Sequence, residues 1–233
     1  MSEVILDYYD ESKKGEELFF SDAPKKKDLN DKSRFFRVIE EPNKIIKYSI
    51  TGLDVDKTIE MITRFRLVKR DMTRTQLPDS LYLEDGLVRG TVIPYFENSP
   101  SLYNIVETHS LEELSKVYQH DDDEIRNLFI MFEAILNALE ELKDHSILYY
   151  DSNPGNFVIH NNQVEIIDFD HRCLRYEESK ENIRKMLENF DELVFLVTKR
   201  LGLIDLPAFY PRDFKSMRKQ LTKVENKIRK NMR

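Results

Sequence analysis

Cysteine and tryptophan are almost missing from this sequence. Among 233 residues there is one cysteine, Cys173, and no tryptophan. A single cysteine excludes an intramolecular disulfide, so nothing in the chain requires an oxidising compartment. Cys173 also has no evident catalytic partner in the sequence, and we expect it to be buried.

Long hydrophobic runs are absent too. A stretch such as Leu193 to Val197 is far too short to cross a bilayer. The N-terminal segment, MSEVILDYYDESKK, lacks the basic and then apolar stretches of a signal peptide. We therefore expect a cytoplasmic protein with no transmembrane segment. A protein delivered into another cell's cytosol would share these features.

Positive charge is outnumbered: 36 lysines and arginines face 43 acidic residues, and the formal net charge is −7. This balance argues against nucleic acid as a partner, because phosphate backbones reward a basic surface. The charge is uneven, however, since residues 215–233 contain eight basic residues. We expect a basic C-terminal helix there, which is either solvated or in contact with an acidic partner, an anionic membrane surface or a phosphorylated substrate.

What is present suits a folded domain, with 40% hydrophobic and 34% charged residues. The first half alternates β-prone segments with one helix. Patterns typical of strands occur at 35–39 and 44–50, and again at 81–83 and 87–96, each pair joined by turn residues. A helix is predicted over 57–72, with Asp54 or Asp56 as its cap.

The second half is mainly helical, around one small hairpin. A long helix is predicted to begin near residues 121–124, where acidic side chains favour a helix start. A wide apolar face makes this helix a main core element; its residues are Ile125, Leu128, Phe129, Phe132, Ile135, Leu136, Leu139 and Leu142. The other predicted elements are helices at 111–118, 181–201 and 214–232, and strands at 156–160 and 164–169.

This order predicts an α+β fold with segregated halves. We expect one two-lobed domain, in which residues 1–96 form a small β-rich N-lobe with one helix and residues 97–233 form a mainly helical C-lobe. A cleft between two such lobes is the expected place for a ligand.

The residues that point to chemistry lie between the long helix and the small hairpin. Asp151 and Asn156 stand five residues apart on a loop, and Asp168 ends the hairpin that follows. Pro154 and Gly155 let the loop turn tightly. Phosphoryl transfer from ATP needs one carboxylate to orient the attacking hydroxyl and oxygen ligands for Mg²⁺. Asp151 suits the first role, and Asn156 and Asp168 suit the second.

This segment resembles the catalytic and metal-binding loops of protein-kinase-like enzymes, D-x-x-x-x-N followed by D-F-G. The form D-x-x-P-G-N is also similar to that of aminoglycoside- and choline-kinase-type enzymes. The resemblance covers about residues 35–200. It implies that the cofactors are ATP and Mg²⁺, or Mn²⁺ in its place.

The same resemblance assigns roles upstream. Lys47, on a strand before a helix, corresponds to the lysine that grips the ATP phosphates, and Glu60 is the candidate for its ion-pair partner. Ile93 takes the gatekeeper position, and Pro94, Tyr95 and Phe96 correspond to the hinge that meets the adenine. Read without the resemblance, Lys47 and Glu60 would be solvated side chains and residues 92–96 a buried edge strand.

The chain departs from the family in several places. No glycine-rich loop occurs, so residues 20–35 would have to cover the phosphates without the freedom that glycine gives. Tyr149 replaces the usual histidine, Tyr150 the usual arginine, and Asp170 the glycine of D-F-G. Few residues follow Asp170 before the next helix, which leaves no activation segment. Asp191 on that helix is a candidate brace for the catalytic loop, or simply a surface acid.

Three functions remain open. The first, which we prefer, is a minimal serine/threonine protein kinase of the effector type with a protein substrate. The second is a small-molecule kinase acting on an alcohol, sugar or aminoglycoside, which the Pro154-Gly155-Asn156 sequence and Asp170 favour. The third is a pseudokinase that serves as an interaction module, which the missing glycine-rich loop favours.

Overall fold

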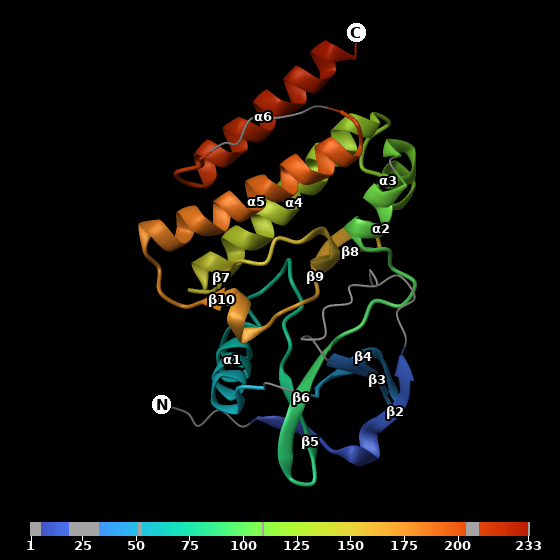
Figure 1. Ribbon diagram of the computed structural model, residues 1–233, viewed down its shortest axis with the longest axis vertical. Coiled ribbons are helices and arrows are strands. Elements are labelled where there is room, and N and C mark those ends of the chain that lie inside the picture. Colours follow the sequence, from blue (N-terminus) through green and yellow to red (C-terminus); the bar gives the residue numbers. More distant parts are fainter. Residues whose placement is uncertain (1–5, 19–32, 51–52, 109, 204–209, 233) are drawn as a thin grey trace. The chain divides into compact units, whose positions relative to one another are not determined.

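The computed structural model describes residues 6–18, 33–50, 53–108, 110–203 and 210–232 (Figure 1). It has mixed α+β structure, as predicted. The contacts within it divide the chain into two compact units. Unit 1 comprises residues 1–97 with 169–171, and unit 2 comprises 98–168 with 172–233. The lobe boundary expected from the sequence was residue 96.

Unit 1 is built on one six-stranded sheet with the strand order β1-β5-β6-β4-β3-β2. β1 runs parallel to β5, and every other neighbouring pair is antiparallel. One helix, α1, connects β4 to β5 along the chain. The elements are β1 (Asp7–Tyr9), β2 (Lys14–Leu18), β3 (Ser33–Val38), β4 (Glu41–Ser49), α1 (Val55–Val68), β5 (Ser80–Glu84) and β6 (Leu87–Pro94), with a short 3₁₀ turn at Glu11–Lys13.

Tight turns fix the two predicted hairpins. Asp85 and Gly86 both have positive φ, as a two-residue hairpin turn requires. The other hairpin turns at Ile39 and Glu40, earlier than the 40–43 turn that the sequence predicted, and Glu40 has a φ of 69°. Two strands were not predicted at all, because β1 and β2 are short and polar.

One face of the unit 1 sheet carries a compact apolar cluster. Phe36, Ile46, Tyr82 and Val92 come from four different strands and are buried together with Val38. The helix α1 begins after Asp54, whose side chain accepts a hydrogen bond from the Lys57 N–H, as predicted for a cap. Its buried residues are Thr58, Met61, Ile62 and Phe65.

Unit 2 is mainly helical (Figure 1). The long helices α4 and α5 contact each other, and α6 contacts both. Two small antiparallel ribbons, β8–β9 and β7–β10, accompany them. The elements are α2 (Leu102–Glu107), α3 (Leu111–Val117), α4 (Glu124–Asp144), β7 (Leu148–Tyr149), β8 (Phe157–His160), β9 (Gln163–Ile166), β10 (Leu174–Arg175), α5 (Lys180–Arg200) and α6 (Phe214–Asn231), with 3₁₀ turns at Pro154–Asn156 and His171–Cys173.

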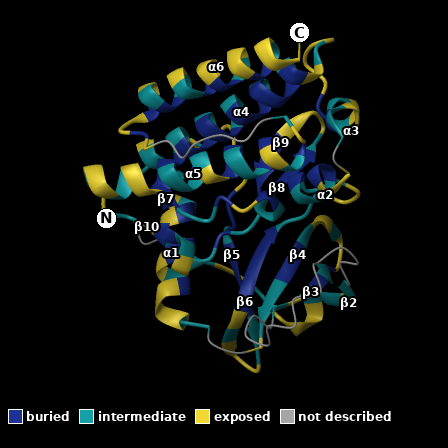
Figure 2. Ribbon diagram, turned by 45° about the horizontal axis from the view of Figure 1, so that its top comes forward, coloured by how far each residue is buried: buried dark blue, intermediate teal, exposed yellow. Residues whose placement is uncertain are grey.

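The core of unit 2 follows the predicted pattern closely. Asp123 caps α4, and all eight residues of its predicted apolar face are buried. Asn161 and Asn162 form the β8–β9 turn with positive φ at both positions. Figure 2 shows the long helices with buried and exposed sides, as amphipathic helices around a shared core should have. No helix in the described part of the chain is long and apolar enough to cross a membrane.

Candidate active site

The loop after β7 is held in a defined turn. Asn153 caps the 3₁₀ turn, because its side chain accepts a hydrogen bond from the Gly155 N–H at 3.0 Å. Pro154 fills the first position of that turn, where its missing N–H costs nothing. The Asn156 N–H then donates to the Asn153 carbonyl at 2.9 Å. The loop therefore reverses within three residues of Asp151, as the proline and glycine predicted.

Asn156 is oriented by two hydrogen bonds from its amide nitrogen. Nδ2 donates to the Tyr149 hydroxyl and to the backbone carbonyl of Asp151, both at 3.1 Å. With the amide in this orientation, Oδ1 accepts no hydrogen bond from any residue that the structure describes. The oxygen is thus available to a cation or another donor.

Asp168 joins the same cluster through the backbone. The Tyr149 hydroxyl donates to the Asp168 carbonyl at 3.1 Å, and the Ile167 N–H donates to the Asn156 carbonyl at 3.0 Å. The β8–β9 pairing, in which Phe157 faces Ile166, brings the two loop ends side by side. Unit 2 therefore gathers Asp151, Asn156 and Asp168, the three residues on which the sequence argument rested.

Tyr149 connects the members of this cluster. Its side chain is fully buried, and its hydroxyl both donates to Asp168 and accepts from Asn156. Burial raises the pKa of Tyr149 well above its ordinary value, and the charges of Asp168 and Asp151 raise it further. The phenol therefore remains neutral at physiological pH and can act as both donor and acceptor.

The Asp151 carboxylate is only half-buried and has one described partner. The Cys173 thiol donates to Oδ2 at 3.6 Å. Cys173 reaches this place because β10 pairs with β7, with Leu174 opposite Tyr149, and because the Tyr150 N–H donates to the Cys173 carbonyl. A carboxylate with one weak donor keeps lone pairs free to accept a proton.

Helix α5 holds the loop from behind. The Asn189 amide donates to the Tyr150 carbonyl, and the Tyr150 hydroxyl donates to the Asn182 carbonyl at 3.1 Å. Sequence reasoning offered Asp191 as a candidate brace, or simply a surface acid, and did not name Asn189, two residues away. Asn189 and Tyr149 act through partners 39 and 19 residues distant, so no local spacing pointed to them.

The oxygen donors of this cluster suit a hard cation. Within the described residues, no group of three histidine, cysteine, aspartate or glutamate side chains could hold a metal ion. Mg²⁺ does not need such a group, because it keeps several waters and binds through one or two protein oxygens plus phosphates. Asn156 Oδ1 and the Asp168 carboxylate are oxygen donors of the kind that this mode of binding uses.

The predicted nucleotide-binding residues belong to unit 1. Lys47 lies on β4 opposite Thr91 of β6, and its side chain is half-buried. Glu60 is not its partner: the Glu60 carboxylate is 52% exposed and pairs with Arg64 one turn along α1, at 2.9 Å. The buried face of α1 carries no carboxylate. Glu60 was chosen by its place in the sequence, but the helix turns it to the solvent.

The segment predicted as a hinge ends β6. Ile93 is buried and faces Ile45 across the ladder, and the Tyr95 N–H donates to the Asn43 carbonyl at 2.8 Å. Pairs alternate in an antiparallel ladder, so Pro94 occupies a position that is not hydrogen-bonded to β4. Its carbonyl therefore points away from β4. Phe96 follows the strand.

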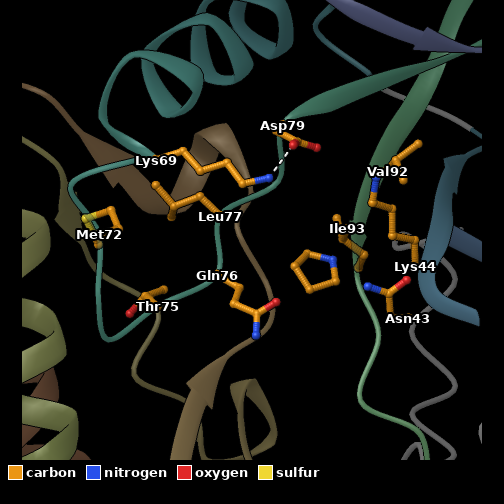
Figure 3. Close-up of a pocket in the computed structure, with 11 residues that line it drawn as sticks. Asn43, Lys44, Lys69, Met72, Thr75, Gln76, Leu77, Asp79, Val92 and Ile93 are labelled. Atoms are coloured by element: carbon orange, nitrogen blue, oxygen red, sulfur yellow. Dashed lines mark hydrogen bonds and ion pairs between the residues drawn. The ribbon is translucent and has the colours of Figure 1, made fainter. Parts of the chain in front are cut away.

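A pocket of about 240 Å³ adjoins this part of unit 1 (Figure 3). Ile93 and Pro94 line it from β6, and Thr75 and Leu77 line it from the segment after α1. At its rim Lys69 and Asp79 form an ion pair. Burial alone would raise the pKa of Asp79, but hydrogen bonds from Lys69 and Ser80 outweigh it, so that the pKa is lowered. The Thr75 hydroxyl is buried here without a described partner.

The segment expected to cover the ATP phosphates, residues 20–35, lies mostly outside the described part of the chain. Residues 19–32 are not described, and the strands on either side of them, β2 and β3, pair antiparallel.

In comparisons with known proteins, no family model matches the chain, and no curated protein is significantly similar to it in sequence.

Proposed function

We propose that this protein is an ATP- and Mg²⁺-dependent phosphotransferase, and specifically a minimal serine/threonine protein kinase. The single observation that carries the proposal is the cluster in unit 2. There Asp151, Asn156 and Asp168 are joined through Tyr149 and Asn156 by hydrogen bonds of 3.1 Å. A structural loop has no need of an acid with one weak donor, an amide oxygen that accepts no described hydrogen bond and a second acid whose backbone joins the same cluster.

The kinase-like fold is part of this proposal. Support comes from the order of elements in unit 1, where the Lys47 strand lies in mid-sheet and is followed by a helix and then by two more strands. In protein kinases the phosphate-gripping lysine also stands on a strand that precedes a helix. The mainly helical unit 2, with its loop and hairpin, agrees with the second lobe.

In the proposed chemistry each residue of the cluster has one task. Asp151 orients the acceptor hydroxyl and accepts its proton, since its carboxylate is half-buried and weakly engaged. Asn156 Oδ1 and Asp168 would hold Mg²⁺, while Tyr149 and Asn189 keep the loop in place. When bound, Mg·ATP would supply the γ-phosphoryl group with ADP as the leaving group, and the metal would neutralise the charge of the phosphates.

The nucleotide contacts rest on the sequence resemblance. We assign Lys47 to the phosphates, and Ile93, Pro94, Tyr95 and Phe96 to the adenine. Glu60 has no part in this assignment, because Arg64 engages it. Lys47→Ala tests the assignment, and we expect it to weaken ATP binding.

The acceptor is proposed to be a protein hydroxyl. Only eleven residues, 169–179, separate Asp168 from α5, and β10 ties that connection to β7. Regulation through a phosphorylated activation loop is therefore not expected.

A pseudokinase is the second candidate, favoured by the absence of a carboxylate on the buried face of α1. Such a module would bind ATP weakly or not at all and transfer nothing.

The decisive experiment is transfer of labelled γ-phosphate from Mg·ATP into proteins of a cell lysate by the purified chain. The Asp151→Ala variant is the test, and Asp122→Ala is the matched control, since Asp122 is exposed and lies outside the cluster. We expect discrete labelled bands with the wild type and the control, and their loss in Asp151→Ala. Equal labelling by all three proteins would overturn the assignment.

If no protein in the lysate is labelled, calorimetric titration with Mg·ATP separates a small-molecule kinase from a pseudokinase. Binding that is lost in Asp168→Ala favours a small-molecule kinase, and a panel of alcohols, sugars and aminoglycosides becomes the next acceptor set. An absence of binding in the wild type would support the pseudokinase.

A further inference from the structure

The outer side of α6 carries a row of lysines that the cluster in unit 2 does not use. Five lysines are exposed along this helix, at spacings of four, four, four and three residues. Such spacing keeps side chains on one face of a helix. The row extends about 22 Å, at 1.5 Å per residue. We call it the lysine stripe; its members are Lys215, Lys219, Lys223, Lys227 and Lys230.

The opposite face of α6 is committed to the fold. Its buried residues, Phe214, Met217, Leu221, Val224 and Ile228, repeat every three or four positions. They lie on the side where α6 contacts α4 and α5. Figure 2 shows the exposed and buried sides of this helix. The stripe is therefore fixed outward by packing, and it does not depend on a helix that forms only on binding.

The arginines of α6 named below form ion pairs with described residues, whereas the lysines of the stripe do not. Arg218 donates to Asn137 and Glu140 of α4, and Arg229 pairs with Asp123 and with Glu225 of its own helix. The five lysines of the stripe have no described ion pair. Glu225, the acidic residue of α6, is 13% exposed at its side chain and is held by Arg126 and Arg229.

We propose that the lysine stripe docks the protein on an anionic phospholipid membrane. Clusters of four to eight basic residues on an amphipathic helix attract the negative lipid surface. A convex helix face with lysines alone offers diffuse positive charge, without the planar forks by which arginine recognises single carboxylates or phosphates. That property favours a flat, continuous anionic surface over an individual acidic side chain. The inference does not depend on the proposed phosphotransferase activity.

The negative charge of the rest of the protein restricts the orientation in which it can bind the membrane. The net charge of the whole protein is −7, so most of its surface is repelled by an anionic bilayer. Attachment must be local, through a patch in which basic residues dominate. With the stripe against the lipid, the face of unit 2 that carries α6 turns toward the membrane.

The test is sedimentation of the full chain with vesicles of phosphatidylcholine alone and of phosphatidylcholine mixed with phosphatidylserine. We expect binding to the mixed vesicles only, and its loss when the salt is raised from about 0.1 M to about 0.5 M, which shortens the screening length. Each lysine near the surface should contribute about a fivefold change in partitioning. Combined Lys219→Gln, Lys223→Gln and Lys227→Gln should therefore weaken binding roughly 100-fold.

The matched control carries Lys57→Gln, Lys116→Gln and Lys180→Gln, three exposed lysines outside α6. It has the same net charge as the stripe variant, and it should bind nearly as well as the wild type. Equal losses in both variants would reduce the effect to net charge and overturn the proposal. Failure of the wild type to bind the mixed vesicles would overturn it too, and binding to a polyglutamate column in that case would assign the stripe to an acidic protein.

Discussion

Tyr149 illustrates how one buried hydroxyl can order a polar cluster. It donates to the Asp168 carbonyl and accepts from the Asn156 amide, and both bonds measure 3.1 Å. The family that the sequence resembles usually has a histidine at this position. A phenol, like an imidazole, can donate and accept through one side chain. In the proposed chemistry Tyr149 is therefore a positioning residue, whose effect passes through Asn156 and Asp168.

Tyr149→Phe should lower both stability and transfer. The substitution keeps the ring but removes the hydroxyl and its two hydrogen bonds, to the Asp168 carbonyl and from the Asn156 amide, which costs about 1–3 kcal/mol in the free energy of unfolding. Because Asn156 then loses one of its two fixed bonds, we expect kcat for phosphoryl transfer to fall about tenfold or more, equivalent to about 1.4 kcal/mol. Urea denaturation and steady-state kinetics measure the two effects.

Tyr150→Phe provides the matched control. It also removes a phenol hydroxyl, which donates to the Asn182 carbonyl of α5 at 3.1 Å and does not contact Asn156 or Asp168. We expect a loss of about 1 kcal/mol in stability and a kcat within about twofold of the wild type. If both variants lost activity in proportion to stability, Tyr149 would be structural only.

Residues of the candidate site differ in how far the sequence could predict them. The sequence could predict Asp151, Asn156 and Asp168, because their spacing is local and a recognisable hairpin separates the last two. Tyr149 and Asn189 were not, because their roles depend on partners brought near by folding. Glu60 was chosen by spacing, yet a shift of one residue around a helix changes the face by about 100°, and buried Met61 stands beside it.

At the scale of elements, α4 is the best predicted part of the molecule. Its eight apolar positions repeat at helical spacing over five turns, and each is buried. The strands β1 and β2 show the reverse case, since their sequences are polar and short. What defines them is pairing with β5 and β3, which are distant in the sequence. Hydrogen bonds of that kind leave no pattern in the strand itself.

Asp123 connects the start of α4 to α6. Its carboxylate caps the helix by accepting from the Arg126 N–H at 2.9 Å, and it pairs with Arg229 at 2.5 Å. Asp123→Ala removes both contacts and should cost about 1–2 kcal/mol. Asp123→Asn keeps a good cap and loses only a partly exposed ion pair, so it should cost less than about 1 kcal/mol. Urea denaturation at pH 7 compares the two variants.

The pH dependence of the free energy of unfolding tests the ion pair between Asp123 and Arg229. The hydrogen-bonded ion pair with Arg229 is the largest cause that lowers the pKa of Asp123 below its ordinary value of 3.8. A carboxyl whose pKa is lowered on folding stabilises the protein above its unfolded pKa, and that contribution is lost as the pH falls through the folded value. The difference in stability between wild type and Asp123→Asn should therefore shrink as the pH falls below about 3.8 and vanish below the folded pKa. A constant difference down to acid pH would contradict the assigned ion pair.

At the scale of the whole molecule, the two units are not consecutive pieces of chain. The backbone leaves unit 2 after Asp168, contributes Phe169 to His171 to unit 1, and returns at Arg172. Phe169 is buried against Phe65 of α1, with ring centroids 5.4 Å apart in an edge-to-face arrangement. The residue after a proposed metal ligand therefore belongs to the core of the other unit.

Phe169→Ala should loosen unit 1 selectively. Deleting a buried phenylalanine ring costs about 3–5 kcal/mol, and the cavity adjoins α1. We expect faster amide hydrogen exchange in α1, with α4 and α5 nearly unchanged, because locally unfolding regions open as cooperative units. Phe132→Ala is the reciprocal variant, since Phe132 packs against Phe129 and Phe190 in unit 2 and should expose α4 and α5 instead. If either substitution raised exchange equally in α1 and α4, the chain would unfold as one body and this division would have no energetic meaning.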